Sequence, residues 1–525
     1  MGKRAKRKKG EPKKVSAQAT ALHAGETIAS ALALMLVLTV GQRLIGFVRG
    51  ILFCRWLPPE ELGTWDLAWN FFMLAAPVAV LGIPGSFGRY VEHFRARGQL
   101  HSFLRNTTLA SVALAAAGVA LVVFARDWFS WFIFDNAQYG GLVMLVAATL
   151  LAVIANNFLS ELFTAMRQMR VVSLIQLSNS ILFAAIGLSM LTWRTDATAI
   201  IAAYGIACVI SGFGAVWVLV YQWRSLPTDE SHLAPRSLWQ KLMPFAVWVW
   251  LTNVVVNLFA VANRFMMVHF SGLDAHDSAV MVGNFHSASV MPILMASLAT
   301  MLSGMLLPHL SRDWEHGNKH AVGARVNLTM KCYGLATMFG SVLLLTASPI
   351  LFGVVLAGKY DGGLSVLPWA LIYCAWFSLA LLAETYLWCA ERPRLACMIY
   401  AIGLAANIGL ALVLLPLWGL LGAVVATAAG NLVVLLLSLW INQRLGMRRD
   451  AAVWLVCALP LVLPLGAWPS AALLAVVFVL VWRGTWILTA EEKRMFAEAL
   501  VPYLRRLRLI PFLCWNTSKK ASPCS

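Results

Sequence analysis

Charged residues are scarce in this chain of 525 residues: they make up 12% of it, whereas 60% of the residues are hydrophobic and the mean hydropathy is +0.75. A soluble interior cannot bury that much apolar surface. Strand-like alternation is also missing, which excludes an outer-membrane barrel, and continuous apolar runs such as 31–40 and 453–465 take its place. The composition therefore predicts an all-α integral membrane protein with no sizeable soluble domain.

Catalytic and metal-binding motifs are missing too. The sequence has no GxSxG or P-loop pattern, and no HExxH or CxxC motif of the kind that binds a metal. Its nine cysteines form no CxxC pair and mostly fall in apolar segments, as reduced packing residues do. We therefore expect no enzyme, no metal and no cofactor. Without a nucleotide-binding motif, transport would have to be driven by a cargo gradient, an ion gradient or a partner.

Apolar segments alternate with loops in a regular charge pattern. Fourteen candidate spans lie near residues 28–53, 64–86, 103–125, 139–160, 171–192, 197–221, 242–270, 279–307, 328–357, 364–389, 395–416, 418–441, 451–467 and 469–488. Alternate loops are rich in Lys and Arg, as cytoplasmic loops are. This bias places both termini in the cytoplasm of a bacterial inner-membrane protein, and it explains the net charge of +18 without a nucleic-acid partner.

The two halves of the chain show a weak duplication. Residues 49–98 resemble residues 264–317, since each stretch runs from an intramembrane arginine through a loop and an apolar span to a basic loop. An even number of spans per half predicts parallel six-helix lobes with a binding cavity between them. The predicted parts are a basic cytoplasmic tail (1–27), an N-lobe (28–225), a cytoplasmic linker (226–241), a C-lobe (242–442), two extra helices (443–488) and a basic amphipathic cytoplasmic tail (489–525).

Arginines inside the spans are the first candidates for the function, because an Arg at the helix centre costs about 2.5 to 3.5 kcal/mol even on lenient scales. In the first span Arg43 lies near mid-depth, and Gln42 shares a helix face with Arg49. Arg49 and Arg264 occupy matching places in the two halves, which predicts that both face one cleft and an anionic cargo. The alternative is that these arginines reach the headgroups or pair with an internal carboxylate.

Amides and carboxylates complete the candidate site. Asn253, Asn257 and Arg264 form one polar stripe along the seventh span. Asp66 and Asn70 share a face at the outer end of the second span, where they either line the cavity or cap the helix at the interface.

A matched pair of carboxylates lies at the cytoplasmic ends of two spans. Leu159-Ser160-Glu161 corresponds to Leu382-Ala383-Glu384 in the second half. Ion coupling is one role for Glu161 and Glu384, and a salt bridge to Arg167 or Arg392 is the other, which we favour.

Several short segments carry a resemblance to a known family. They are RLIGFVR (43–49), WLPPEELG (56–63), LGI (81–83), GKY (358–360) and LPLWGLLGA (415–423). In this order and spacing, which covers nearly the whole chain, the sequence resembles the oligosaccharide flippases of the polysaccharide-transport branch in the multidrug, oligosaccharidyl-lipid and polysaccharide exporter superfamily. The Arg-x5-Arg spacing is also similar to that of lipid II flippases, although Gly50 stands where an acidic residue often follows there.

The resemblance implies alternating access that carries sugars linked to undecaprenyl pyrophosphate to the outer leaflet for surface polysaccharide biosynthesis. It implies that Arg43 and Arg49 contact the pyrophosphate, and the partners would be a lipid-linked oligosaccharide, the bilayer and other polysaccharide-assembly proteins. Three alternatives stay open: an ion-coupled multidrug antiporter of the same superfamily, a membrane sugar transferase or polymerase, and a scaffold that transports nothing. An antiporter would prefer membrane carboxylates, and a transferase would need a larger aqueous loop.

Overall fold

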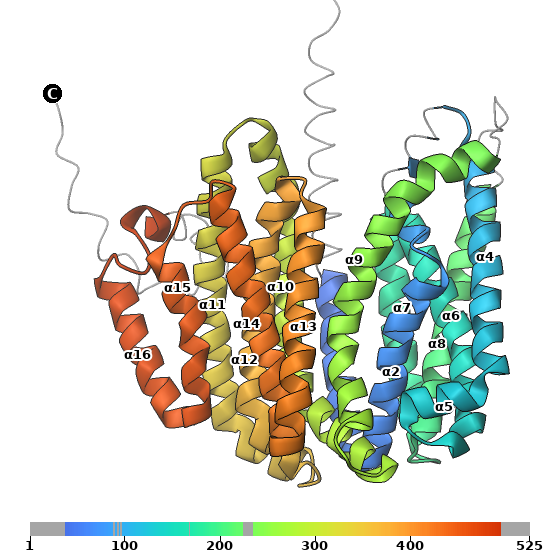
Figure 1. Cartoon of the computed structure of the whole chain (residues 1–525), viewed down its shortest axis with the longest axis horizontal. Helices are drawn as coiled ribbons and strands as arrows, with labels where there is room; N and C mark the ends of the chain where they lie inside the picture. The colour runs from blue at the N-terminus through green and yellow to red at the C-terminus, as the bar shows by residue number, and fades with distance from the viewer. Residues whose placement is uncertain are drawn as a thin grey trace, which may run out of the picture. The chain divides into compact units, whose positions relative to one another are not determined.

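The computed structural model describes residues 37–223, apart from 88, 89, 92, 93, 95, 96 and 167, and residues 235–494. Within these ranges every regular element is a helix. After a first helix, Val37–Trp56, they are α2 (Pro59–Ala79), η1 (Pro84–Ser86), α4 (Leu100–Phe124), α5 (Arg126–Phe134), η2 (Ala137–Tyr139), α6 (Gly140–Ala165), α7 (Met169–Leu191), α8 (Ala197–Trp223), α9 (Pro235–His269), α10 (Ala275–Glu315), α11 (Lys319–Ile350), η3 (Leu351–Val355), α12 (Asp361–Cys389), α13 (Pro393–Trp418), α14 (Leu420–Arg444), α15 (Ala451–Ala458), η4 (Leu459–Leu465) and α16 (Ala467–Arg483) (Figure 1). The predicted N-terminal tail, much of the linker and most of the C-terminal tail lie outside the described residues.

The prediction of a polytopic helical membrane protein is confirmed. Every predicted span contains a helix, and ten helices in the described part are long and apolar enough to cross a membrane. A bent pair, Ala246–Phe259 and Val261–His269, would add an eleventh. Helix α2 does not reach the same hydropathy, and the C-terminal helices 451–465 and 467–483 are shorter. The count of fourteen therefore stays a prediction.

Two compact units divide the chain, one up to Asn257 and one from Leu258. In the first unit α7 packs against α8, both α8 and α4 pack against α6, and α2 packs against α6 (Figure 1). The second unit repeats this order, since α13 packs against α14, both α14 and α11 pack against α12, and α10 packs against α12. This repeated packing is what two pseudo-symmetric lobes require.

Helix ends repeat as well as helix pairs. Gly98 and Gly317 both adopt positive φ, +61° and +79°, after the second span of their unit. In each case the following residue, Gln99 or Asn318, donates its N–H to a carbonyl five residues earlier, over 2.9 and 3.0 Å. This is the hydrogen bond that ends a helix on a left-handed residue, a position that favours glycine. The predicted duplication is thus visible in the backbone.

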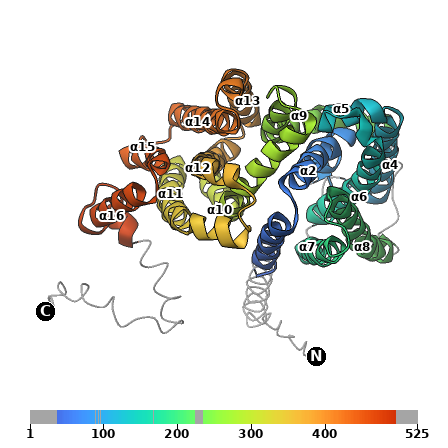
Figure 2. The same ribbon diagram turned by 90° about the horizontal axis from the view of Figure 1, so that it is seen from below.

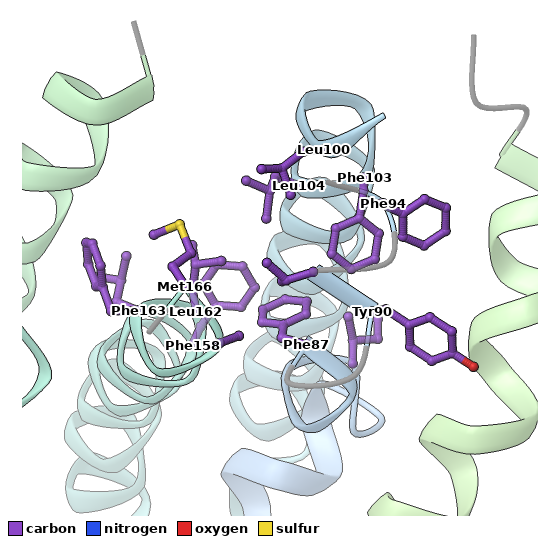
Figure 3. Close-up of a cluster of buried hydrophobic side chains, with 14 of the residues drawn as sticks. Phe87, Tyr90, Phe94, Leu100, Phe103, Leu104, Phe158, Leu162, Phe163 and Met166 are labelled. Atoms are coloured by element: carbon purple, nitrogen blue, oxygen red, sulfur yellow. The ribbon is translucent and has the colours of Figure 1, made fainter. Parts of the chain in front are cut away.

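Large apolar side chains hold the segment after α2 in the N-terminal unit (Figure 3). Phe94 stacks on Phe103 of α4 with 4.8 Å between ring centroids, and Phe87 meets Phe158 of α6 edge to face at 5.5 Å. Aromatic pairs in these geometries add to the stabilisation that burial alone provides. The cluster therefore fixes this segment against α4 and α6.

A short helix that the sequence analysis did not predict, α5, follows α4. Its nine residues are too few for a span, and Trp128 and Trp131 on it are exposed. Trp128 stacks on Phe132 with 5.0 Å between ring centroids. Exposed tryptophans beside a span end are typical of the membrane interface.

The extra C-terminal helices belong to the second unit, where α15 and α16 lie beside α11 (Figure 2). The side chain of Lys331, on α11, is 2% exposed, and its Nζ lies 2.9 Å from Asp450 and 2.6 Å from Glu492. Asp450 also caps α15 by accepting the N–H of Ala452. A buried lysine needs such partners, so these ion pairs tie the C-terminal helices to the lobe.

Candidate functional site

A cavity of about 410 Å³ lies within the N-terminal unit. Pockets that bind small molecules typically hold about 300–1,000 Å³. Seven amide side chains from the first helix, α6, α7 and α9 line it: Gln42, Asn156, Asn157, Gln176, Asn179, Asn253 and Asn257. The cavity is therefore a polar chamber among helices that are otherwise apolar.

Glu161 is the one charged side chain on the described cavity wall, where no Lys or Arg is found. It is exposed and lies four residues before the end of α6. Arg167, its predicted salt-bridge partner, lies outside the described residues. The described wall thus offers hydrogen-bonding groups and one carboxylate, which is a poor surface for a phosphate.

A break after α2 forms part of the same wall. The chain turns there through two residues with positive φ, Leu81 at +47° and Gly82 at +68°, before η1 begins. A Cβ at Gly82 would lie 2.6 Å from Trp250 Cβ and 2.9 Å from the Ala246 carbonyl oxygen. Only glycine permits both this turn and the close approach of α9. Interrupted spans in membrane transporters commonly mark binding sites, because irregular backbone is tolerated where it lines a cavity.

Three predicted site residues, Gln42, Asn253 and Asn257, line this cavity together with Glu161. Asn257 Nδ2 donates to the Asn253 carbonyl over 2.9 Å, so its side-chain oxygen is not used by this bond. Two other predicted residues do not contribute to the wall. Asp66 and Asn70 are buried in α2, where Asn70 Nδ2 donates to the Asp66 carbonyl over 2.7 Å.

Arg49 packs on an aromatic cluster beside the cavity rather than on its wall. Its guanidinium carbon lies 4.1 Å from the ring centroid of Phe183 and 6.0 Å from that of Phe53. The Phe183 centroid in turn lies 4.9 Å from that of Tyr204, which does line the cavity. Arg43 is exposed on the same helix. A cation over an aromatic face is stabilised without a carboxylate.

Arg264 has a similar aromatic neighbour in the C-terminal unit. Its guanidinium carbon lies 4.5 Å from the ring centroid of Phe285 on α10. Asp274, which follows α9, caps α10 by accepting the N–H of Asp277 over 2.8 Å. The predicted stripe on α9 is therefore divided, with its amides in the first unit and its arginine in the second.

Glu384, the counterpart of Glu161, is sealed in the C-terminal unit. Glu384 is 6% exposed, and its carboxylate accepts a hydrogen bond of 3.0 Å from the Tyr400 hydroxyl. No ion pair joins it to Arg392 within the part of the chain that the structure describes. The two carboxylates match in sequence but differ in access.

The sequence analysis missed four amides of the cavity: Asn156, Asn157, Gln176 and Asn179. The last two are three residues apart on α7, a spacing that puts both on one helix face. An amide stripe of this kind, like that of the seventh span, is a sequence signal that could have identified the two amides on α7. Tyr204 gave no comparable signal, because a lone tyrosine in an apolar span is usually packing.

Comparisons with known proteins give a consistent result. The model of a family described as polysaccharide biosynthesis protein matches residues 29–314. An uncharacterized membrane protein of Methanocaldococcus jannaschii is 18% identical over 421 residues, which cover 76% of this chain and 81% of that protein.

Solved structures share the fold at low identity. The lipid II flippase MurJ in an inward closed conformation is 13% identical with a TM-score of 0.67, over 89% of this chain and 100% of its own. An inward-facing multidrug resistance transporter of the MATE family in the MOP superfamily is 12% identical with a TM-score of 0.62, over 79% and 95%. The chain therefore has the fold of flippases and exporters.

Proposed function

The chain belongs to the polysaccharide biosynthesis protein family, and on that premise we propose that it is a flippase for a lipid-linked oligosaccharide. The cargo would be a glycan on undecaprenyl pyrophosphate, moved by alternating access across the cytoplasmic membrane for cell-surface polysaccharide assembly. A flippase fold over 89% of the chain supports this proposal. The spans also contain arginines that an inert membrane anchor would not need.

The main support for the proposal is the position of Arg49, a cationic side chain inside the first span. A pyrophosphate that crosses hydrocarbon alone loses its hydration, whereas an arginine can replace lost water with two parallel hydrogen bonds. The guanidinium carbon of Arg49 lies 4.1 Å from the centroid of the Phe183 ring. A guanidinium that packs on an aromatic ring can still donate to a phosphate, because its five N–H groups lie in its own plane. Arg43 and Arg264 are proposed as further cargo contacts.

Substitution of the arginines tests this role. Arg43→Ala and Arg49→Ala should each abolish export of the surface polysaccharide without lowering protein abundance, because only a cargo contact is removed. Arg194→Ala is the matched control, since Arg194 is exposed in the loop after α7 and its contact with Asp196 is long, 3.8 Å. Export should be measured in cells and in vesicles that contain a labelled lipid-linked sugar. Full export by both Arg43→Ala and Arg49→Ala would remove the cargo role.

One observation favours a second candidate function, an ion-coupled multidrug antiporter. The described cavity wall carries one carboxylate and no basic side chain, which suits a cationic drug. Uptake of cationic dyes into vesicles under a sodium or proton gradient would support this function. Translocation of the lipid-linked sugar without any dye uptake would exclude it.

A further inference from the structure

The amide-lined cavity of the N-terminal unit lies next to the aromatic cluster that holds Arg49, but no basic side chain is found on its described wall. Resting on the proposed function, we propose that this cavity binds an uncharged sugar residue of the cargo, close to its pyrophosphate. The site would thus recognise glycan hydroxyl groups, while the arginines recognise charge.

Unused hydrogen-bonding capacity on the wall is the first argument. Asn179 Oδ1 is buried without a hydrogen-bond partner, and the exposed side chains of Asn157 and Gln176 line the same cavity. A buried acceptor is normally met by protein, water or ligand. Amides both donate and accept, as sugar hydroxyls do, so a sugar can satisfy many of these groups at once.

Other ligand classes fit the wall less well. A phosphate would find no Lys or Arg among the described lining residues. A metal ion would find one carboxylate, and no group of three His, Cys, Asp or Glu side chains that could hold a metal is present in the described residues. A purely apolar molecule would leave the amides unsatisfied, which is unfavourable.

An apolar part of the wall suits the faces of a sugar ring. Met73, Pro77 and Ile154 lie among the amides, and Tyr204 adds an aromatic ring. That ring is held in place by Trp69 and Phe183, with centroids at 5.1 and 4.9 Å. Binding pockets commonly combine apolar walls with a few fixed polar groups that set orientation.

The nearness of Arg49 to the cavity indicates which sugar of the cargo would bind there, namely the one next to the pyrophosphate. The guanidinium carbon of Arg49 lies 4.1 Å from the Phe183 centroid, and Phe183 contacts the Tyr204 ring of the cavity wall. The rings of Phe183 and Tyr204 thus connect Arg49, the proposed phosphate contact, to the cavity wall. This arrangement matches a pyrophosphate bonded directly to a sugar.

Binding of neutral sugars to the purified full chain tests the inference. We would record saturation-transfer NMR with a panel of methyl glycosides and neutral disaccharides. The wild type should bind at least one of them saturably. Asn157→Leu and Gln176→Leu should weaken that binding about fivefold, the usual effect of one lost hydrogen bond. Gln138→Leu, an exposed amide outside the cavity, should leave it unchanged.

Two results would overturn the inference: no saturable sugar signal from the wild type, or equal sugar binding by the wild type and both cavity variants. If no sugar binds and the protein unfolds at a higher temperature in sodium chloride than in choline chloride, the cavity is an ion site instead. Thermal unfolding of each variant verifies that it is folded.

Translocation separates this inference from the proposed function. Vesicles would receive the lipid-linked glycan pool extracted from source cells that lack the protein, and a membrane-impermeant pyrophosphatase would report which leaflet holds it. Sugar binding without translocation contradicts the flippase but leaves the sugar site. Translocation by the wild type and both cavity variants, without sugar binding, contradicts the site but leaves the flippase.

Discussion

The N-terminal and C-terminal units share one packing order but use their polar groups differently. In the first unit Glu161 and seven amides line an open cavity. In the second, Glu384 is sealed against Tyr400, and Lys331 is paired with Asp450 and Glu492. The carboxylate of the first unit thus lines a cavity, whereas the matching carboxylate of the second unit is buried and hydrogen-bonded to a tyrosine. The position of a polar residue in a span therefore does not reveal its role until its burial is known.

Breaking the internal pairing of the second unit should have the largest effect. Lys331→Met leaves Asp450 and Glu492 close together without their cation. Removal of one partner from a buried ion pair costs roughly 3–5 kcal/mol. Because these two carboxylates are partly exposed, we expect a loss of stability near the lower end, about 3 kcal/mol. Thermal unfolding in detergent measures the loss. Lys319→Met is the control, because Lys319 is exposed on the same helix.

Neutralising the carboxylates tests the origin of that effect. The combined variant Lys331→Met, Asp450→Asn and Glu492→Gln should recover part of the lost stability, because no buried charge remains unpaired. Equal instability of the single and the combined variant would contradict the ion-pair explanation and point to packing of the lysine stem.

Removing the break after α2 should affect the first unit nearly as strongly. Gly82→Ala places a Cβ 2.6 Å from Trp250 Cβ at a φ of +68°. Left-handed strain and overpacking together should cost about 2–4 kcal/mol. Gly141→Ala is the control, since no atom lies within 4 Å of a Cβ there. If Gly82→Ala unfolds like the wild type and still exports the glycan, the tight turn is not needed.

Much of this architecture follows from the sequence for simple physical reasons. Apolar runs of about 20 residues must be helical in a bilayer, so the spans were predictable. The duplication was predictable because Arg49 and Arg264, like Glu161 and Glu384, recur in matching order. Asn253 and Asn257, the amides of the predicted α9 stripe, line the cavity of the N-terminal unit, and their role in cargo binding stays a prediction.

Other features depend on contacts that one sequence does not contain. The bond between Lys331 and Glu492 joins residues 161 positions apart. Leu81 adopts a positive φ that leucine disfavours, so its residue type does not predict this turn. Matching sequence around Glu161 and Glu384 gave equal expectations for both, whereas the structure leaves Glu161 exposed and buries Glu384 against the hydroxyl of Tyr400.

The difference between the two carboxylates predicts different effects on export. Glu161→Gln should lower the rate of export in vesicles about tenfold, equivalent to about 1.4 kcal/mol, because Glu161 is the charged side chain on the described cavity wall. Glu384→Gln should leave export nearly unchanged, since a glutamine oxygen can still accept from Tyr400. A comparison of initial rates with and without a proton or sodium gradient measures this. Equal losses in the two variants would show that access does not decide their roles.

The smallest expected effect concerns the hydrogen bond between Tyr400 and Glu384. Tyr400→Phe removes the hydroxyl that donates to Glu384 over 3.0 Å and leaves a buried carboxyl group short of one partner. Such a loss costs roughly 1 kcal/mol, which thermal unfolding can resolve. In the double variant Tyr400→Phe, Glu384→Leu the effect of the tyrosine should vanish, because no polar group remains to be satisfied. If Tyr400→Phe instead alters export while stability stays constant, Glu384 acts in transport, and the functional contrast between the two units disappears.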